Sequence, residues 1–279
     1  ADGYYVAESL DDVQVWWDAG LVEYAVPDAE LELLEDPPDD DPPSLPPDDP
    51  RFPDQWYLDL IDAAGAWCKG LNGKGIKVAV IDSGVYREHE DLDYEQISGY
   101  SFLGLPENYD SYDDRTGHGT FVTGLLAAEM GNGKGIAGLS DRVSVLSLRC
   151  FSNSGEGEYN SGSGQVSTVL SAIGYAMDQN VDVINMSFGG TNEASLLPLK
   201  DKLEEAAARG IILVAAVGNT GSSMLYYPAA FDCVIGVGMV NSAGTVDANS
   251  QRNESVFVTA PGSGVLSLGY ASPQSYSAG

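Results

Sequence analysis

Apolar and polar positions change their period several times along the chain after about residue 55. Five nearly continuous apolar runs predict strands buried on both faces. These runs are residues 76–81, 143–148, 181–188, 211–217 and 233–240. Apolar residues at helical spacing predict helices directly after His118, over 165–179, and over 199–209 with its end at Gly210. This alternation indicates an α/β fold, with a mainly parallel, twisted sheet and helices on both faces.

Polar residues stand where four of these predicted strands end. They are Asp82, Arg149, Ser187 and Asn219. In a parallel sheet the carboxyl ends of the strands meet at one edge, and binding sites form in the crevice there. We therefore expect the functional site at this edge.

The first 54 residues follow different patterns. Residues 1–34 mix apolar and acidic positions and predict a small α+β segment, which is too short for a core of its own. Residues 35–54 are rich in proline and aspartate, as in an extended linker. The predicted organisation is a segment over 1–34, a linker over 35–54 and a globular domain over 55–279.

The formal net charge of −29 narrows the range of partners. So acidic a surface repels nucleic acid phosphates and anionic lipid heads. No apolar run reaches the roughly 18 residues that a membrane span needs. We expect neither a nucleic acid partner nor a membrane partner.

Cysteines and histidines are few enough to assess singly. Cys68, Cys150 and Cys233 lack metal-ligand spacing, and we interpret Cys150 and Cys233 as buried small apolar residues rather than catalytic thiols. His89 stands among carboxylates and is expected at the surface or in a cap. His118 lies between two glycines, which leave its imidazole uncrowded.

Taken alone, two of the polar residues allow a structural as well as a chemical interpretation. Asp82 either presents a rigidly held carboxylate or starts a turn after its strand. Asn219 either donates to a developing oxyanion or adopts a left-handed turn conformation. Residue chemistry leaves both choices open.

Five motifs together resemble the subtilisin-like serine proteases, over residues of about 55–279. They are Ile81-Asp82-Ser83-Gly84-Val85, His118-Gly119-Thr120-Phe121-Val122-Thr123-Gly124, Ile184-Asn185-Met186-Ser187-Phe188-Gly189-Gly190, Ala216-Val217-Gly218-Asn219 and Thr259-Ala260-Pro261-Gly262, in the family's order. The resemblance implies a serine endopeptidase in which Asp82 orients His118, His118 is the general base and Asn219 is the oxyanion donor.

The nucleophile that this family uses lies in a Gly-Thr-Ser motif. Residues 276–279 resemble the lead-in to that motif, so the serine is expected two residues beyond Gly279. Ser275 and Ser277 lack the motif. The resemblance therefore implies that the 279-residue chain is inactive by itself, and that a C-terminal fragment is a possible partner that supplies the serine helix.

Substrate-binding segments follow from the same resemblance. Ser163-Gly164-Gln165 and Ser187-Phe188-Gly189 resemble the edge strands that hold a peptide by main-chain pairing. Ala216-Val217-Gly218 resembles one wall of the primary specificity pocket, and Tyr226 stands at its floor. The implied partner is a peptide or protein substrate.

Residues 1–34 resemble the end of a subtilase propeptide. This implies that Leu31-Glu32-Leu33-Leu34 runs through the cleft, with Leu31 and Leu34 in its two apolar pockets. The alternative is that residues 1–50 are disordered. The resemblance further implies a zymogen that is secreted or attached to the cell surface, with its signal peptide already removed.

Calcium is common in the family, but no cofactor is required for the implied reaction. Residues 129–135 offer few oxygen side chains and include a lysine, so we assign no calcium ligands and no metal site. The alternative to a protease is a non-catalytic, protease-like protein that binds peptides or regulates a partner protease. The coding sequence after Gly279 distinguishes the two hypotheses.

Overall fold

The structure is a computed structural model that describes residues 18, 45–103, 112–152 and 162–279. Contacts divide the chain into two units, Ala1–Pro37 and Pro38–Gly279. The predicted segment over 1–34 lies outside the described residues except for Asp18, and the account below concerns the second unit.

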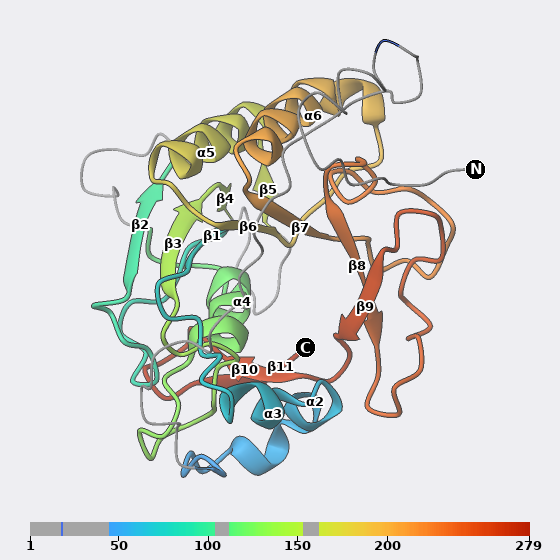
Figure 1. The fold of residues 1–279 in the computed structure, drawn as a ribbon. Helices are drawn as coiled ribbons and strands as arrows, with labels where there is room; N and C mark the ends of the chain where they lie inside the picture. Colours follow the sequence, from blue (N-terminus) through green and yellow to red (C-terminus); the bar gives the residue numbers. More distant parts are fainter. Residues whose placement is uncertain (1–17, 19–44, 104–111, 153–161) are drawn as a thin grey trace. The chain divides into compact units, whose positions relative to one another are not determined.

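Seven strands form one sheet in which every neighbouring pair is parallel (Figure 1). Their order across the sheet is β2-β3-β1-β6-β7-β8-β9. Their bounds are β1 Lys77–Asp82, β2 Ile97–Ser101, β3 Ser144–Arg149, β6 Val183–Met186, β7 Ile212–Ala216, β8 Ile235–Val240 and β9 Val258–Pro261. The parallel α/β fold predicted from the sequence is confirmed.

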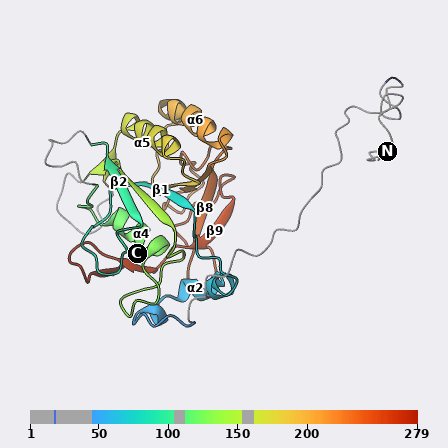
Figure 2. The ribbon, with the colours of Figure 1, turned by 60° about the vertical axis from the view of Figure 1, so that its left-hand side comes forward.

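Three longer helices cover this sheet, and shorter elements flank it (Figures 1 and 2). The longer helices are α4 His118–Ala127, α5 Val166–Asp178 and α6 Glu193–Ala208. The short ones are η1 Phe52–Asp54, α2 Trp56–Leu60 and α3 Ala63–Trp67. Two small antiparallel pairs complete the fold: β4 Phe151–Ser152 with β5 Ser163–Gly164, and β10 Leu266–Leu268 with β11 Tyr276–Ala278.

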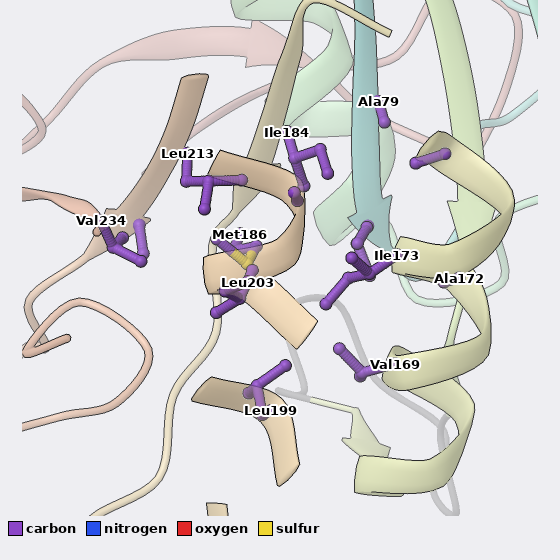
Figure 3. Packing of buried hydrophobic residues seen from close by; sticks show 14 of the residues in the cluster. Ala79, Val169, Ala172, Ile173, Ile184, Met186, Leu199, Leu203, Leu213 and Val234 are labelled. Atoms are coloured by element: carbon purple, nitrogen blue, oxygen red, sulfur yellow. The ribbon is translucent and has the colours of Figure 1, made fainter. Parts of the chain in front are cut away.

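Two apolar cores lie on opposite faces of the sheet because strand residues alternate in direction. Ala79 and Ile81 of β1 belong to the same core as residues of α5 and α6, and Figure 3 shows Ile173, Leu199 and Leu203 of these helices. Val78 and Val80 belong to the other core, with residues of α4 and β10. Helices thus cover both faces, and β1 is buried between them.

All five predicted strands are present, but two edge strands were not predicted. β2 buries only its first and last residues, and β9 leaves Val258 47% exposed. An edge strand has one neighbour and needs no continuous apolar run. The apolar pattern therefore identified the inner strands and missed these two.

The predicted bounds of the third helix were wrong at its start. The helix begins at Glu193 rather than Leu199, with the Asn192 side chain accepting a hydrogen bond from the Ser195 amide. Pro198 lies inside it. Leu199 is its first fully buried residue, so the apolar pattern begins there although the backbone helix starts earlier.

Of the two placements expected for His89, the surface position was wrong, since the residue is completely buried. Its Nδ1 accepts a hydrogen bond from the Asp91 amide at 3.2 Å, and its Nε2 lies 2.8 Å from the Ser275 carbonyl oxygen. The ring meets Tyr276 edge to face at 5.2 Å. Acidic neighbours in sequence therefore did not place this histidine in solvent.

The described end of the predicted linker, residues 45–54, packs on the folded unit. Asp49 is 2% exposed. Leu45 and Phe52 pack against the core that contains residues of α4 and β10. The Asp49 carboxylate accepts hydrogen bonds from the Gly131 and Asn132 amides. This part of the chain is consequently not an extended, solvated linker.

Candidate active site

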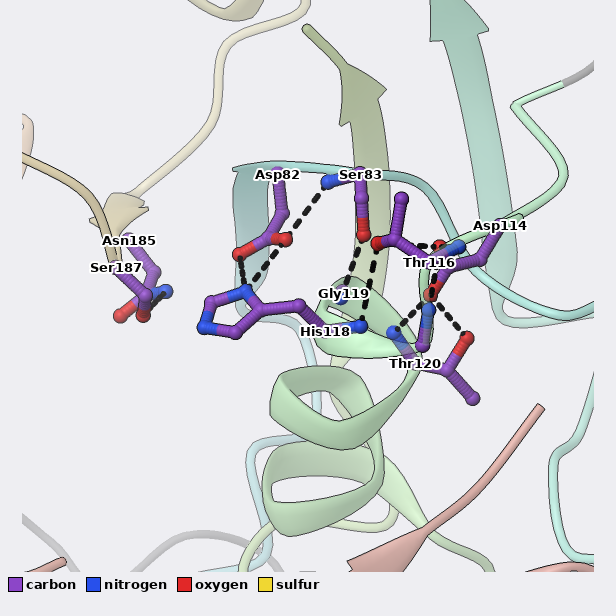
Figure 4. Close-up of polar contacts among 10 residues, drawn as sticks. Asp82, Ser83, Asp114, Thr116, His118, Gly119, Thr120, Asn185 and Ser187 are labelled. Atoms are coloured by element: carbon purple, nitrogen blue, oxygen red, sulfur yellow. Dashed lines mark hydrogen bonds and ion pairs between the residues drawn. The ribbon is translucent and has the colours of Figure 1, made fainter. Parts of the chain in front are cut away.

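Asp82 and His118 come together at the carboxyl edge of the sheet (Figure 4). Asp82 is the last residue of β1 and 4% exposed, and His118 is the first residue of α4. The imidazole Nδ1 lies 2.8 Å from Oδ1 and 3.0 Å from Oδ2 of the carboxylate. The Ser83 amide also donates to Oδ1 at 2.7 Å and so helps to hold the carboxylate in place.

The other imidazole nitrogen is available for chemistry. A carboxylate only accepts, so Nδ1 carries the proton and Nε2 has a lone pair. The His118 side chain is 43% exposed, and no other described residue forms a hydrogen bond with Nε2. An oriented imidazole with an accessible lone pair is suited to take a proton from a nucleophile.

Burial by itself would lower the pKa of His118. The hydrogen bond and charge of Asp82, together with the charge of Asp114, outweigh burial and raise the pKa. Asp82 thereby stabilises the imidazolium that forms when His118 accepts a proton.

Close backbone approach brings α4 to the end of β1. The Gly119 amide donates to the Ser83 hydroxyl at 2.9 Å. A Cβ atom on Gly119 would lie 3.2 Å from Cβ of Asp82 and would overlap the Gly84 carbonyl. Glycine at this position allows the helix carrying His118 to approach the strand carrying Asp82.

The two predicted substrate segments lie near each other through an aromatic pair. Ser163-Gly164-Gln165 is exposed, and its first two residues form β5 against β4. Phe188 follows β6 and meets Phe151 of β4 with ring centroids 4.9 Å apart. Asn185 donates to the Ser187 hydroxyl at 2.9 Å, and Figure 4 shows this pair beside Asp82 and His118. Phe151 was not predicted, because only its cross-strand position brings it here.

Asn219 lies in an exposed turn after β7, directly after Ala216-Val217-Gly218. Its side chain forms no hydrogen bond with another described residue. Gly218 has φ +106, so the left-handed conformation belongs to the glycine and not to Asn219. The amide of Asn219 is therefore not used in capping its own turn.

Gln251 holds this turn in place and was not predicted. It is 1% exposed, and its Oε1 accepts from the Thr220 amide at 3.0 Å and from the Ser222 amide at 3.2 Å. Its Nε2 donates to the Met224 carbonyl at 3.0 Å. An isolated glutamine in irregular sequence carries no local signal of such a role.

Tyr226 packs beside two of the predicted pocket segments. A Cβ atom on Gly218 would lie 2.8 Å from its ring, and one on Gly189 would lie 3.4 Å from its side chain. The tyrosine side chain therefore lies between the turn after β7 and the segment after β6.

Three carboxylates accept hydrogen bonds from backbone amides of the loop after α4. The Gly131 and Asn132 amides donate to Asp49, the Gly133 amide to Asp48, and the Ile136 amide to Asp91. Within the described residues no cluster of three or more His, Cys, Asp or Glu side chains suits a metal.

The cysteines differ from one another in burial. Cys150 is buried, and burial raises the pKa of its thiol to about 12, so it is not a ready thiolate. Cys233, expected to be buried, is half-buried, and Cys68 is exposed. Residues 31–34, expected in the cleft, lie outside the described residues.

Comparisons with known proteins identify the family of this chain. The family profile described as "Subtilase family" matches residues 73–278. The major intracellular serine protease of Bacillus subtilis (strain 168) is 38% identical over 218 residues, which are 75% of this chain and 65% of that protein. The minor extracellular protease Epr of the same strain is 34% identical over 215 residues, 77% of this chain and 31% of that protein. Subtilisin DY of Bacillus licheniformis is 37% identical over 214 residues, 75% of this chain and 73% of that protein.

The chain thus spans 65% of the length of the first of these relatives and 31% of the second. Among the described residues, no helix combines the length and apolar character that a bilayer crossing demands. The resemblance read from five motifs is confirmed by a match that covers most of the chain. This chain belongs to the subtilase family of serine proteases.

Proposed function

We propose that this protein is a serine endopeptidase in which Asp82 and His118 are two members of the relay. The observation that carries the proposal is the 2.8 Å contact between Nδ1 of His118 and the buried Asp82 carboxylate, with Nε2 left accessible. A structural histidine would be expected to use both nitrogens, as His89 does.

The proposed reaction begins when Nε2 of His118 takes the proton of a serine hydroxyl. The serine oxygen attacks the scissile carbonyl, and Asp82 stabilises the imidazolium without taking its proton. The carbonyl oxygen becomes an oxyanion, and the Asn219 side-chain amide donates to it. His118 then returns the proton to the leaving amine, and water completes the cycle by the same route.

The nucleophile in this proposal is a serine two residues after Gly279. The position of Gly279 supports this assignment, since a Cβ atom on it would lie 3.0 Å from the ring of Phe121, one turn along α4 from His118. Gly279 also exchanges two backbone hydrogen bonds with Val265. The chain therefore runs alongside the helix that carries the proposed base.

The test compares residues 1–279 with a chain extended by the coding sequence that follows. A fluorophosphonate probe, which reacts with an activated serine, should add to the extended chain and not to the shorter one, as intact mass would show. His118→Ala in the extended chain is the matched control and should abolish labelling. Peptide binding without labelling or hydrolysis would support the non-catalytic alternative instead.

We further propose that Tyr226 shortens the primary specificity pocket. Its ring fills the space between Gly218 and Gly189, so small and medium residues before the cut should be preferred. Tyr226→Gly should shift the ranking toward Phe and Tyr, and Tyr226→Phe should leave it unchanged. One methylene of fit is worth only about 1–3 kcal/mol, so the preference should be graded. A peptide library with an unchanged ranking in Tyr226→Gly would contradict the assignment.

Two proposals concern residues outside the described part and the location of the protein. We propose that residues 31–34 occupy the cleft. Amide exchange should then find these residues protected, and Leu34→Asp should abolish the protection.

We also propose that the protein is exported from the cell. The name of the extracellular relative supports this proposal, and the name of the intracellular relative opposes it. Detection in the medium rather than in the cell extract decides the location.

A further inference from the structure

Asp114 has no part in the relay, yet it is 3% exposed and lies next to the start of α4. Oδ1 accepts from the Thr116 amide at 2.8 Å and from the Gly117 amide at 3.0 Å. Oδ2 accepts from the Thr120 amide at 2.9 Å and from the Thr120 hydroxyl at 2.6 Å. One carboxylate therefore binds amides on both sides of His118.

These contacts complete the hydrogen bonding of the first helical turn, whose amides lack partners within the helix. The His118 amide donates to the Thr116 hydroxyl at 3.5 Å, and the Gly119 amide donates to the Ser83 hydroxyl at 2.9 Å. Every amide from 116 to 120 consequently has an acceptor. Only Asp114 and Ser83 among these acceptors lie outside the turn.

Both outer acceptors are fixed to the strand end that carries Asp82. Ser83 is its neighbour in sequence and donates its own amide to the Asp82 carboxylate. The Asp114 amide donates to the Val85 carbonyl at 3.0 Å, and the Val85 amide donates to the Tyr112 carbonyl at 2.9 Å. The end of β1, the loop at 112–114 and the start of α4 thus form one hydrogen-bonded frame. Figure 4 shows the part of it in which Ser83 and Asp114 contact α4.

We propose that Asp114 is a positioning residue, which holds the first turn of α4 so that Nδ1 of His118 meets the Asp82 carboxylate. The inference rests on the proposed function for its catalytic meaning. A cap that served stability alone could stand at any helix, whereas this one brackets the proposed base from both sides.

The charge of Asp114 acts in the same direction as its hydrogen bonds. The groups whose charges act on the His118 imidazole are Asp82 and Asp114, and both raise the pKa of His118 against the effect of burial. Asp114 also acts on Arg149, where its charge, like that of Asp113, opposes the lowering of the Arg149 pKa by burial and by the charge of Arg115. Loss of the Asp114 charge should therefore lower the pKa of His118.

The first experiment uses the 279-residue chain and needs no activity. With two histidines in the sequence, the imidazole ¹⁵N and ¹H resonances can be assigned by His118→Ala. Asp114→Asn should weaken the Nδ1–H signal of His118, speed its exchange with solvent and lower the pKa of His118. His89 should not change and is the internal reference.

Asp113→Asn is the matched control, because it removes a neighbouring carboxylate charge, and the Asp113 carboxylate accepts from the Arg87 amide at 3.4 Å. It should leave the Nδ1–H signal unchanged. A folded Asp114→Asn protein with a lower Tm but unchanged His118 signals would overturn the proposal, since Asp114 would then be only a stabilising cap.

Ser83→Ala keeps the proposal testable if Asp114→Asn does not fold. It removes the other outer acceptor and leaves the Ser83 amide on Asp82, so the His118 signal should change in the same direction. An unchanged His118 Nδ1–H signal in Ser83→Ala would overturn the proposal that this frame positions His118 against Asp82.

An extended, active chain provides the kinetic readout. Asp114→Asn should lower kcat by about 10- to 100-fold with KM changed by less than about threefold, because small misplacement of a reacting group costs this much. If the extended chain is inactive while the resonances respond as expected, the proposed function fails and the positioning role stands.

Discussion

The two histidines of this chain occupy opposite environments, although a carboxylate lies close to each of them. His118 uses one nitrogen on Asp82 and leaves the other accessible, with 43% of its side chain exposed. His89 is completely buried and uses both nitrogens, on the Asp91 amide and the Ser275 carbonyl. The proton therefore resides on Nδ1 in His118 and on Nε2 in His89.

Their partners explain the different roles. The partner of His118 is a carboxylate, which stabilises the charged imidazolium and so prepares the ring to accept a proton. The partners of His89 are backbone groups, which favour one neutral tautomer and link two segments 186 residues apart. A histidine is suited to proton transfer when one ring nitrogen donates to a carboxylate and the other ring nitrogen forms no hydrogen bond.

The pKa directions follow from the same contacts. Burial lowers the pKa of His89, and the Ser275 carbonyl and the charge of Glu90 oppose this only in part. Burial also raises the pKa of Asp91 to about 6. The pKa of His118 moves the other way, because Asp82 and Asp114 outweigh burial.

The largest expected effect is on catalysis at His118. In the extended chain, His118→Ala should reduce turnover by at least about 1,000-fold, because the relay acts as a unit. Peptide hydrolysis at saturating substrate measures it, and the unfolding free energy should change by less than about 1 kcal/mol. A loss below about tenfold would remove His118 from the role of general base.

The next effect separates stability from catalysis at His89. His89→Ala should lower the unfolding free energy by about 3 kcal/mol, since it leaves a cavity and two unsatisfied backbone groups. His89→Phe keeps the ring against Tyr276 but loses both hydrogen bonds, and should cost about half as much. Urea unfolding of the 279-residue chain measures both. Equal stability of the wild type and His89→Ala would refute the structural role.

The smallest effect concerns pH. The raised pKa of His118 contributes stability that is fully present below the unfolded value of about 6.5 and is lost as the pH rises through the folded pKa. The lowered pKa of His89 contributes stability that is present above about 6.5 and is lost as the pH falls toward the folded pKa. Histidine resonances should therefore titrate on opposite sides of this value, and titration of both on the same side would break the comparison.

Solvent screening should keep the contribution of the raised His118 pKa to the unfolding free energy below about 1 kcal/mol. Unfolding curves at several pH values, with His118→Gln as the reference, should show the wild type losing relative stability as the pH rises. The same comparison with His89→Phe should show it losing relative stability as the pH falls.

The inner strands, the parallel sheet and the family could all be predicted from the sequence. An inner strand such as β1 must be apolar on both faces, and this appears as a continuous run. The motifs around Asp82 and His118 are local in sequence, because the turn and the helix start that present each residue are built from its neighbours. The edge strands β2 and β9 escaped prediction, since one-sided burial leaves no such run.

The contacts that complete the candidate site were decided by the tertiary structure. Asp82 and His118 each reach the sheet edge through local sequence, but their 2.8 Å contact depends on Ser83 and Asp114 meeting the first turn of α4. Gln251, Phe151 and the burial of His89 likewise depend on segments that are distant in the chain. Sequence patterns record which residues are apolar and which turns are possible, whereas hydrogen bonds between distant segments exist only once packing has brought those segments together.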